Sequence, residues 1–344
     1  TGMNQIMNYL DKIVRKQKNN KAVGITSICS ANPQVLETSF LYARKIGNTI
    51  LVESTCNQVN QFGGYTGMTP AVFTAYIRNL AEQIGFPKER ILIGGDHLGP
   101  YVWRNETTAS AIERSRILVR DYVQAGYQKI HIDTSMRCAD NPQHTPLSPE
   151  EIAERTSDLV AVSESTSESL DLDNHNIHYV IGTEVPSPGG IQVEEDTLQP
   201  TRPEQVEETI ELTKKAFYKR RLESAWERVI AVVVQPGVEF GNNIIFDYER
   251  SQAEGLKRFI ESTNRLIYEA HSTDYQSWLS NNNGFIRNFA ILKVGPALTF
   301  AYREAIYALA MIDKELFAVR SDWQSSNITE ILEKVMLENQ KYWR

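Results

Sequence analysis

Eight short apolar segments, which alternate with amphipathic helical patterns, constrain the fold of this sequence more than any other feature. Each segment is rich in β-branched residues and bounded by turn residues, which is typical of a strand buried on both faces of a sheet. The segments span residues 24–30, 49–55, 90–100, 129–135, 177–185, 229–237, 266–272 and 289–296. Strict alternation of strands and helices predicts a parallel sheet with right-handed crossovers, and eight such units predict a closed (β/α)8 TIM barrel.

Helical patterns fill the connections between these segments. The predicted helices cover residues 3–19, 33–47, 69–84, 106–125, 203–219, 299–312 and 327–338, and one more begins at 148. We expect one α/β domain over residues 1–344, with the barrel at about 20–313, an extra N-terminal helix and a helical extension at 314–344. The alternative is an open doubly wound sheet, which would favour a glycine-rich fingerprint after the first strand, and Ser30-Ala-Asn-Pro33 is not one. A segment rich in serine and acidic residues, 163–176, is predicted to be a solvated connection.

The charge balance and the cysteines limit the classes of function. The formal net charge is −7 and the pI is near 5.5, which argues against a general nucleic-acid binder because such proteins present a basic face. No apolar run approaches the roughly 18 residues of a membrane span, so we expect no membrane partner. Three cysteines without CxxC spacing argue against a disulfide framework or a zinc knuckle, and a cytoplasmic location fits them.

Polar and ionisable residues gather at the carboxyl ends of the predicted strands. They are Ser30, Asn57, Gln58, Asp96, His97, Asp133, Ser135, Glu184, Gln235, His271, Ser272, Asp274 and Lys293. In a barrel these ends meet at one mouth, where barrel enzymes carry their active sites. Unrelated helix-capping residues could produce a similar pattern, because helix starts attract Ser, Asp and Asn, but His, Glu and Lys are poor caps.

Three of these residues suit a metal site. His97 and His271 could share a divalent ion with an oxygen ligand such as Glu184, since two imidazoles and a carboxylate are a recurring open zinc set. We therefore expect a divalent metal cofactor, with zinc favoured. His131 is predicted to be a hydrogen-bonded structural histidine, and His178 is predicted to be solvated.

Other residues of this set suit catalysis and substrate binding. Asp96, Asp133 and Glu184 are the candidate acid–base groups. The candidate substrate ligands are Ser30, Asn57, Gln58, Gln235, Ser272, Asp274 and Lys293. Barrels often bind phosphate over their last two strands, where backbone N–H groups near Ser272 and Gly295 could act together with Lys293. Pro296 has no N–H, which weakens such a cradle.

Seven stretches of the chain resemble one protein family. They are residues 29–33, 57–70, 94–100, 181–186, 235–240, 269–276 and 292–300, of which 57–70 is the most specific. The family is the GatZ/KbaZ subunit of class II D-tagatose-1,6-bisphosphate aldolase, and the likeness covers nearly the whole chain. Members of the family continue past the point where this sequence ends, so we expect a further segment after Arg344.

The resemblance implies a non-catalytic partner that shares the fold of the zinc-dependent catalytic subunit. It implies that the chain supports the activity and stability of that subunit in the breakdown of galactitol, N-acetylgalactosamine or tagatose. The implied partners are a catalytic class II aldolase subunit and a ketose or ketose phosphate, and we expect an oligomer. Related sequences are assigned a metal-dependent 4-epimerase activity on ketohexoses or tagaturonate, which is the alternative function.

The resemblance also assigns roles to particular residues. Class II aldolases carry an Asp-His pair on the third strand, with the Asp as acid–base group and the His on zinc, and Asp96-His97 matches that pair. His271 matches a zinc ligand that follows the seventh strand, but Gln235 stands where a third zinc histidine is expected after the sixth. The loss of one ligand fits a non-catalytic subunit. It equally fits a redesigned metal site in which Glu184 or Gln235 takes the vacant position.

Overall fold

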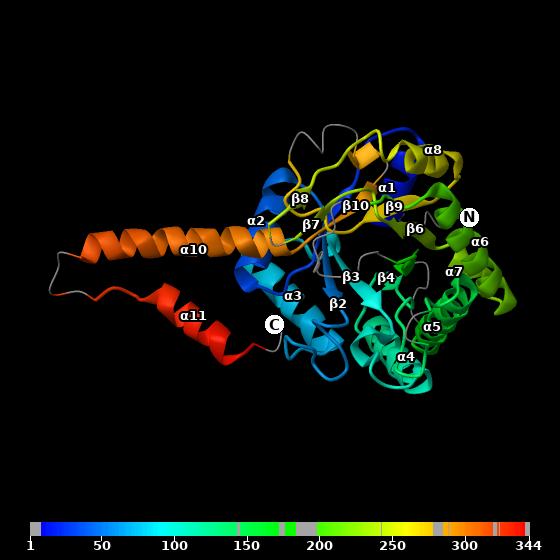
Figure 1. Cartoon of the computed structure of the whole chain (residues 1–344), viewed down its shortest axis with the longest axis horizontal. Helices are drawn as coiled ribbons and strands as arrows, with labels where there is room; N and C mark the ends of the chain where they lie inside the picture. Colours follow the sequence, from blue (N-terminus) through cyan, green and yellow to red (C-terminus); the bar gives the residue numbers. More distant parts are fainter. Residues whose placement is uncertain are drawn as a thin grey trace. The chain divides into compact units, whose positions relative to one another are not determined.

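Eight parallel strands close into a barrel in the order β1-β10-β9-β6-β5-β4-β3-β2, which confirms the predicted (β/α)8 fold. Helices lie around the strands (Figure 1). The barrel strands are β1 Ile25–Ile28, β2 Ile50–Thr55, β3 Ile91–Leu98, β4 Lys129–Ile132, β5 His178–Ile181, β6 Val229–Val234, β9 Ile267–Ala270 and β10 Phe289–Val294. The computed structural model describes residues 8–142, 145–171, 176–183, 198–241, 243–277, 285–287, 289–318, 322 and 324–340. Every barrel strand pairs in parallel with both neighbours, so all eight carboxyl ends face one mouth.

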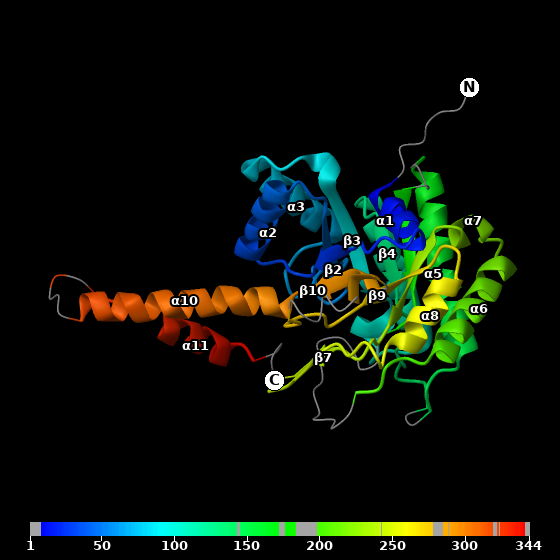
Figure 2. The same ribbon diagram turned by 90° about the horizontal axis from the view of Figure 1, so that it is seen from above.

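Helices follow the strands and surround them, with α2 and α3 on one side of the barrel and α5, α6 and α8 on the other (Figure 2). The helices are α1 Tyr9–Lys18, α2 Pro33–Ile46, α3 Pro70–Ile84, α4 Thr108–Gln124, α5 Pro149–Ser169, α6 Pro203–Lys219, α7 Glu223–Trp226, α8 Glu254–Ser262, α10 Pro296–Phe317 and α11 Ile328–Glu338. Proline at the first position starts α2, α3, α5 and α6, because its fixed φ suits a helix start and its missing N–H would have no partner there. The Asn32 side chain caps α2 by accepting hydrogen bonds from Gln34 and Val35.

The helix α1 closes the end of the barrel opposite the mouth. Its apolar stripe, Leu10, Ile13 and Val14, is buried in one cluster with residues from the strands, among them Ile25 of β1 and Ile267 of β9. Burying each of these side chains contributes about 1.5–3 kcal/mol. His178, which was predicted to be solvated, is instead buried beneath α1, with Nε2 2.8 Å from Asp11 Oδ1. That prediction was wrong because α1 supplies the polar partner that solvent would otherwise provide.

The segment 163–176 differs from its prediction as a solvated connection. The helix α5 continues to Ser169, and Ser163, Glu164 and Ser167 are buried. Glu164 accepts a hydrogen bond from Arg228 and another from the Tyr179 hydroxyl. The polar composition of this segment therefore reflects polar contacts with β5 and the start of β6 rather than exposure to water.

Several shorter elements lie within connections that carry no predicted structure. They are α7, α8 and the antiparallel hairpin of β7 Glu239–Phe240 and β8 Ile245–Phe246. The strand β3 agrees with the predicted segment 90–100, although Gly94-Gly95 interrupt its apolar run in the sequence. In the structure β3 extends to Leu98 and is buried along its whole length.

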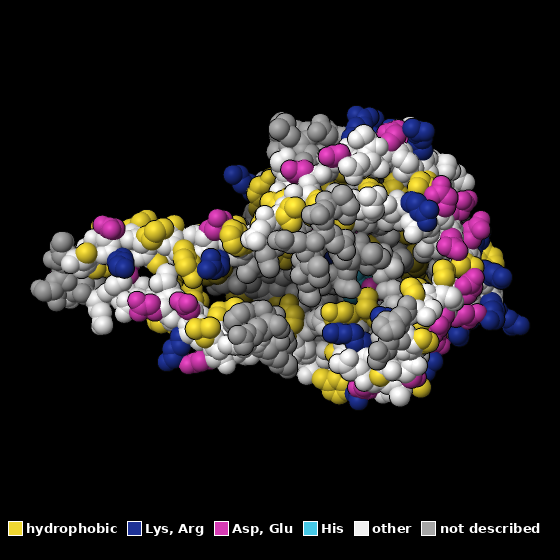
Figure 3. Space-filling model, in the orientation of Figure 1, with side chains coloured by type: hydrophobic (Ala, Val, Ile, Leu, Met, Phe, Trp, Pro, Cys, Tyr) yellow, Lys and Arg dark blue, Asp and Glu magenta, His cyan; other side chains and the backbone are white. Residues whose placement is uncertain are grey.

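The chain divides into two compact units, Thr1–Gly295 with the barrel and Pro296–Arg344 with α10 and α11. Within the second unit, the side-chain hydroxyls of Ser325 and Ser326 donate to Asp313, which links the start of the α11 segment to α10. Apolar side chains are exposed along both helices, among them Leu309, Met311 and Leu337 (Figure 3). Among the residues that the structure describes, no helix combines the length and the apolar character needed to cross a bilayer.

Candidate functional site

A bulge in β3 places Asp96 and His97 at the mouth of the barrel. Gly95 pairs with Ile130 of β4 and Leu98 pairs with Ile132, so two residues of β3 stand opposite His131 alone. Neighbouring residues of a regular strand point to opposite faces. The bulge and the positive φ of His97, 48°, change this and leave both Asp96 and His97 buried beside His131. Such strain in a non-glycine residue is typical of functional sites.

Three histidines and one aspartate converge at this bulge. The ring centroid of His97 lies 5.0 Å from that of His131 and 4.9 Å from that of His271. One ligand atom of Asp96, His97, His131 and His271 lies within 4.8 Å of the corresponding atom of each of the others, and all four residues are buried. The predicted pair His97 and His271 is thus brought together. Glu184, the predicted third ligand and acid–base candidate, lies outside the described residues.

His131 joins this cluster, although it was predicted to be a structural histidine. Its Nδ1 lies 2.8 Å from Asp96 Oδ1, and its Nε2 lies 3.0 Å from the carbonyl oxygen of Gly182. Burial, reinforced by the neighbouring His97, lowers the pKa of His131 to about 3, so its imidazole is neutral at pH 7. Lys129 and His131 share the inward face of β4, because residues two apart on a strand point the same way. That spacing is the signal that could have placed His131 in the site.

Carboxylates behind the cluster hold two of the imidazoles. His97 Nδ1 lies 3.0 Å from Asp133 Oδ2, and His271 Nε2 lies 2.9 Å from Glu269 Oε1. Burial alone would raise the pKa of Asp133, but the hydrogen bonds from His97 and Ser135 and the charges of His97 and His131 together hold that pKa well below its usual range. Burial likewise opposes the effect of Lys129 on Glu269, whose pKa is also held well below its usual range. Carboxylates in this position orient metal-binding histidines.

A layer of buried ion pairs supports the cluster from within the barrel. Lys129 Nζ lies 2.7 Å from Glu53 Oε1 of β2 and 2.6 Å from Glu269 Oε2 of β9, and all three side chains are fully buried. The absence of a side chain at Gly94 makes room for this layer, because a Cβ there would lie 2.8 Å from Glu53 Cγ. The sequence did not lead us to expect any of these three charged residues in the site. Their signal was a charge at an inward position of an otherwise apolar strand.

Lys293 of β10 reaches the same cluster, although it was predicted to bind substrate. Its ammonium group pairs with Asp96 Oδ2 and lies 3.8 Å from Glu53 Oε2. The side chain is 7% exposed, so the charge is almost fully removed from water. Lys293 therefore joins the layer of ion pairs to the histidine cluster.

The other predicted substrate ligands lie at the mouth and contact nearby backbone. Ser30 Oγ accepts a hydrogen bond from Asn32 N, and Gln58 Oε1 accepts one from Thr55 N. Asn57 accepts a hydrogen bond from Tyr65 N through its backbone carbonyl. Ser272 follows β9 with a positive φ of 52°. These residues lie around the mouth, while their role toward a substrate stays a prediction.

The backbone groups predicted to hold phosphate over β9 and β10 have partners within the protein. Gly295 N donates to Asp274 Oδ1 at 2.9 Å, and Thr273 N donates to the carbonyl oxygen of Lys293 at 3.3 Å. A phosphate there would have to displace a carboxylate that already accepts one of these hydrogen bonds. This region is therefore a poor anion site.

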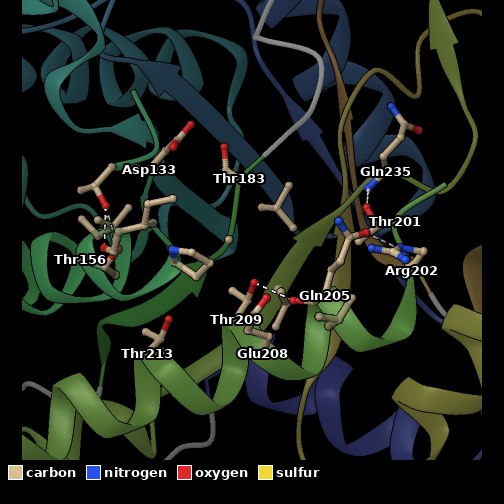
Figure 4. Close-up of a pocket in the computed structure, with 18 of the residues that line it drawn as sticks. Asp133, Thr156, Thr183, Thr201, Arg202, Gln205, Glu208, Thr209, Thr213 and Gln235 are labelled. Atoms are coloured by element: carbon tan, nitrogen blue, oxygen red, sulfur yellow. Dashed lines mark hydrogen bonds between the residues drawn. The ribbon is translucent and has the colours of Figure 1, made fainter. Parts of the chain in front are cut away.

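A cavity of about 570 Å³ opens beside the cluster, between the ends of β4 to β6 and the helix α6 (Figure 4). Asp133 and Thr183 lie at one side of it, and Gln205 and Thr209 project toward it from α6. Its volume is within the range of small-molecule sites. Asp133 lines this cavity and also contacts His97, so the cavity adjoins the histidine cluster.

The donor set at the cluster fits a divalent cation. The Gly182 carbonyl can only accept, so the neutral His131 carries its proton on Nε2 and turns an unprotonated Nδ1 toward the Asp96 carboxylate. Two acceptor atoms 2.8 Å apart repel each other unless a proton or a cation lies between them. The connected carboxylates Glu53, Asp96, Asp133 and Glu269 also outnumber the ammonium groups of Lys129 and Lys293. This excess of negative charge favours a bound cation.

The chain is similar to proteins of one family. Residues 10–344 match the family described as "D-tagatose-1,6-bisphosphate aldolase subunit GatZ/KbaZ-like". The D-tagatose-1,6-bisphosphate aldolase subunit GatZ of Klebsiella pneumoniae is 47% identical over 332 residues, which are 96% of this chain and 77% of the relative. A crystal structure titled as a probable tagatose 6 phosphate kinase, from Sinorhizobium meliloti 1021, is 41% identical with a TM-score of 0.82, covering 93% of this chain and 76% of that chain.

A more distant likeness concerns the fold alone. The fructose-bisphosphate aldolase of Campylobacter jejuni is 12% identical with a TM-score of 0.56, over 96% of this chain and 89% of that chain. The family match and the high identity to curated relatives cover nearly all of the sequence. The chain therefore belongs to the GatZ/KbaZ-like family of D-tagatose-1,6-bisphosphate aldolase subunits.

Proposed function

We propose that this chain is a supporting subunit of a D-tagatose-1,6-bisphosphate aldolase, which binds a catalytic class II subunit and raises its activity and stability. The geometry of Gln235 carries the proposal. Its Oε1 accepts hydrogen bonds from Gly237 N and Val238 N at 2.9 and 3.1 Å, and its Nε2 lies 3.4 Å from Glu239 Oε2. Gln235 thus stabilises its own turn and does not supply the ligand that a zinc histidine would provide at this position.

A divalent metal, with zinc favoured, would be held by the imidazoles of His97, His131 and His271 and by the carboxylate of Asp96. Such an ion supplies Lewis-acid polarisation of a ketose carbonyl oxygen. Asp133 and Glu269 would fix the orientation of His97 and His271. The residues keep the means to bind a cation, while the lost ligand at Gln235 separates this site from that of an active class II aldolase.

The substrate side of the proposal rests on the cavity beside the cluster. A ketose or ketose phosphate is within the size that its volume of about 570 Å³ accepts. Thr183, Thr201 and Gln205 offer hydroxyl and amide groups for a sugar, and Arg202 offers a charge for a phosphate. The cytoplasmic location and the oligomer expected from the sequence belong to the same proposal.

Mixing experiments test the supporting role. A catalytic class II subunit would be assayed for cleavage of tagatose 1,6-bisphosphate, alone and with an equimolar amount of this chain, and then again after heating. We expect a higher rate, a longer half-life at elevated temperature and co-elution of both chains in gel filtration. An equal mass of albumin controls for non-specific protection, and this chain alone controls for its own activity. Unchanged rate and half-life together with separate elution would contradict the proposal.

A metal-dependent ketose 4-epimerase is the second candidate, and the buried cluster of His97, His131, His271 and Asp96 favours it. Asp96 and Asp133 would move the protons, or support cleavage and re-addition of the carbon chain. The test is incubation of the metal-loaded chain, without a catalytic subunit, with tagatose, fructose or tagaturonate. Formation of the 4-epimer, followed by chromatography and lost in His271→Asn, would support this candidate. No conversion of any of these sugars would reject it.

A further inference from the structure

The cation nearest the candidate metal ligands belongs to the protein itself. Lys293 Nζ pairs with Asp96 Oδ2, the same oxygen atom that lies 3.6 Å from His97 Nε2. A metal ion held by Asp96 and His97 would therefore lie close to an ammonium group. Two positive charges at such a distance repel strongly in a buried site, because little water screens them.

The backbone of Lys293 is held in place beside the loop after β9. Its backbone carbonyl accepts hydrogen bonds from both Oγ1 and N of Thr273, at 2.7 and 3.3 Å, in the loop that also positions His271. Among the residues that the structure describes, Glu53 is the other carboxylate paired with Lys293, and Glu53 also pairs with Lys129. Moving the ammonium group away from Asp96 would therefore leave a buried charge with weaker compensation.

A second group of possible ligands leads to the same residue. One ligand atom each of Cys29, Glu53 and Asp96 also lies within 4.8 Å of the others. Lys293 contacts both carboxylates of that group, and it contacts Asp96 of the histidine group. One ammonium group therefore stands at the junction of both clusters that the described residues offer to a cation.

We propose that Lys293 is an internal counter-cation that competes with a divalent metal for Asp96 and so keeps the metal affinity of this site low. This inference rests on the metal-binding capacity described under the proposed function. It explains how three histidines can converge here although the ammonium group of Lys293 already compensates the charge of Asp96. In this arrangement Lys293 sets how readily the site loads with metal.

The experiment is a titration of the purified chain with Co²⁺, whose visible absorption reports binding and coordination. Lys293→Met and Lys293→Gln remove the charge, and Lys293→Arg keeps a positive charge as the matched control. We expect both neutral variants to bind Co²⁺ at least about tenfold more tightly than the wild type, and the Arg variant to resemble the wild type. Adding Asp96→Asn to Lys293→Met should abolish the gain. Circular dichroism would establish that each variant is folded.

The contrary outcomes are equally definite. Neutral variants that bind Co²⁺ no more tightly than the wild type would overturn the proposal. Failure of the wild type and of all three Lys293 variants to bind Co²⁺ would also overturn it. An Arg variant that gains as much as Lys293→Met would also overturn it, because the effect would then come from space rather than charge. Stimulation of a catalytic subunit is measured separately and without metal in this chain, so failure of the supporting role and failure of this inference are distinguishable.

Discussion

His97 Nδ1 lies 3.0 Å from Asp133 Oδ2, with both side chains buried at the mouth of the barrel. Asp133 fixes the imidazole, so that Nε2 is the nitrogen on the side of Asp96 Oδ2. The same carboxylate accepts hydrogen bonds from Ser135 Oγ and N through its other oxygen, at 2.7 and 3.1 Å. This carboxylate–histidine pair is the arrangement that orients metal ligands in proteins.

We therefore predict that Asp133→Asn weakens metal binding by about 10–100-fold, since the amide no longer selects the imidazole tautomer. The titration is best made with Co²⁺ in the Lys293→Met background, where we expect binding to be tight enough to measure. Ser135→Ala is the matched control, because it removes one hydrogen bond to Asp133 and keeps the carboxylate. Equal affinity of the Asn variant and its parent would show that Asp133 does not orient His97.

The barrel could be predicted from sequence because its signal is repeated along the whole chain. Eight buried strands need eight apolar segments, and each must be followed by a helix that covers it. The joint location of Asp96, His97 and His271 could also be predicted, since parallel strands bring their carboxyl ends to one mouth. Neither inference required knowledge of a single side-chain contact.

The side-chain contacts within the site could not be predicted in the same way. The inward position of His131 follows from the spacing of β4, but its contact with Asp96 depends on the bulge in β3. The partners of Lys129 come from β2 and β9. The pattern of each strand does not show which residues of different strands lie at the same level along the barrel axis. The prediction that 163–176 is solvated was wrong for a similar reason. Its burial depends on Arg228, which reaches Glu164 from a distant part of the chain. The predicted role of Glu184 stays a prediction.

The ion pair of Arg228 and Glu164 gives a stability prediction. Both residues are nearly buried, and the Tyr179 hydroxyl donates to the same carboxylate. Arg228→Met alone should lower the free energy of unfolding by about 3–5 kcal/mol, because it leaves a buried carboxylate without its cation. The double variant with Glu164→Leu should recover most of this loss. Urea unfolding of the four proteins measures the coupling, and additive losses would argue against a mutually dependent pair.

The contact between Gly99 and Asp133 gives a second stability prediction. A Cβ on Gly99 would lie 1.8 Å from the backbone carbonyl oxygen of Asp133, and a backbone atom cannot rotate away. Gly99→Ala should therefore cost about 3 kcal/mol or more and displace Asp133 from His97. Gly47→Ala is the control, since its Cβ would meet no atom within 4 Å and only its positive φ of 74° is unfavourable. Equal unfolding midpoints for the two variants would contradict this account.

The last prediction concerns pH and the contact between α1 and α8. Lys18 Nζ donates to the carbonyl oxygen of Ile260 at 2.6 Å and to Thr263 Oγ1 at 3.0 Å. Burial lowers the pKa of Lys18 to about 8, against 10.5 for an exposed lysine, although Glu261 partly opposes this. At a pH between these two pKa values, Lys18 is protonated in the unfolded chain and deprotonated in the folded chain. The contribution of Lys18 to stability therefore rises with pH across this window, is complete above it and is lost as the pH falls through about 8.

Comparison with Lys18→Met isolates this effect from the tyrosines and cysteines that titrate in the same range. The free energy of unfolding in urea would be measured for both proteins at pH 7.5 and pH 9.5. We expect the wild type to gain stability relative to the variant as the pH rises. Lys16→Met, which removes an exposed lysine of the same helix, controls for the loss of charge alone. A wild-type curve that stays parallel to that of Lys18→Met would mean that Lys18 releases its proton at the same pH in the folded and unfolded chain.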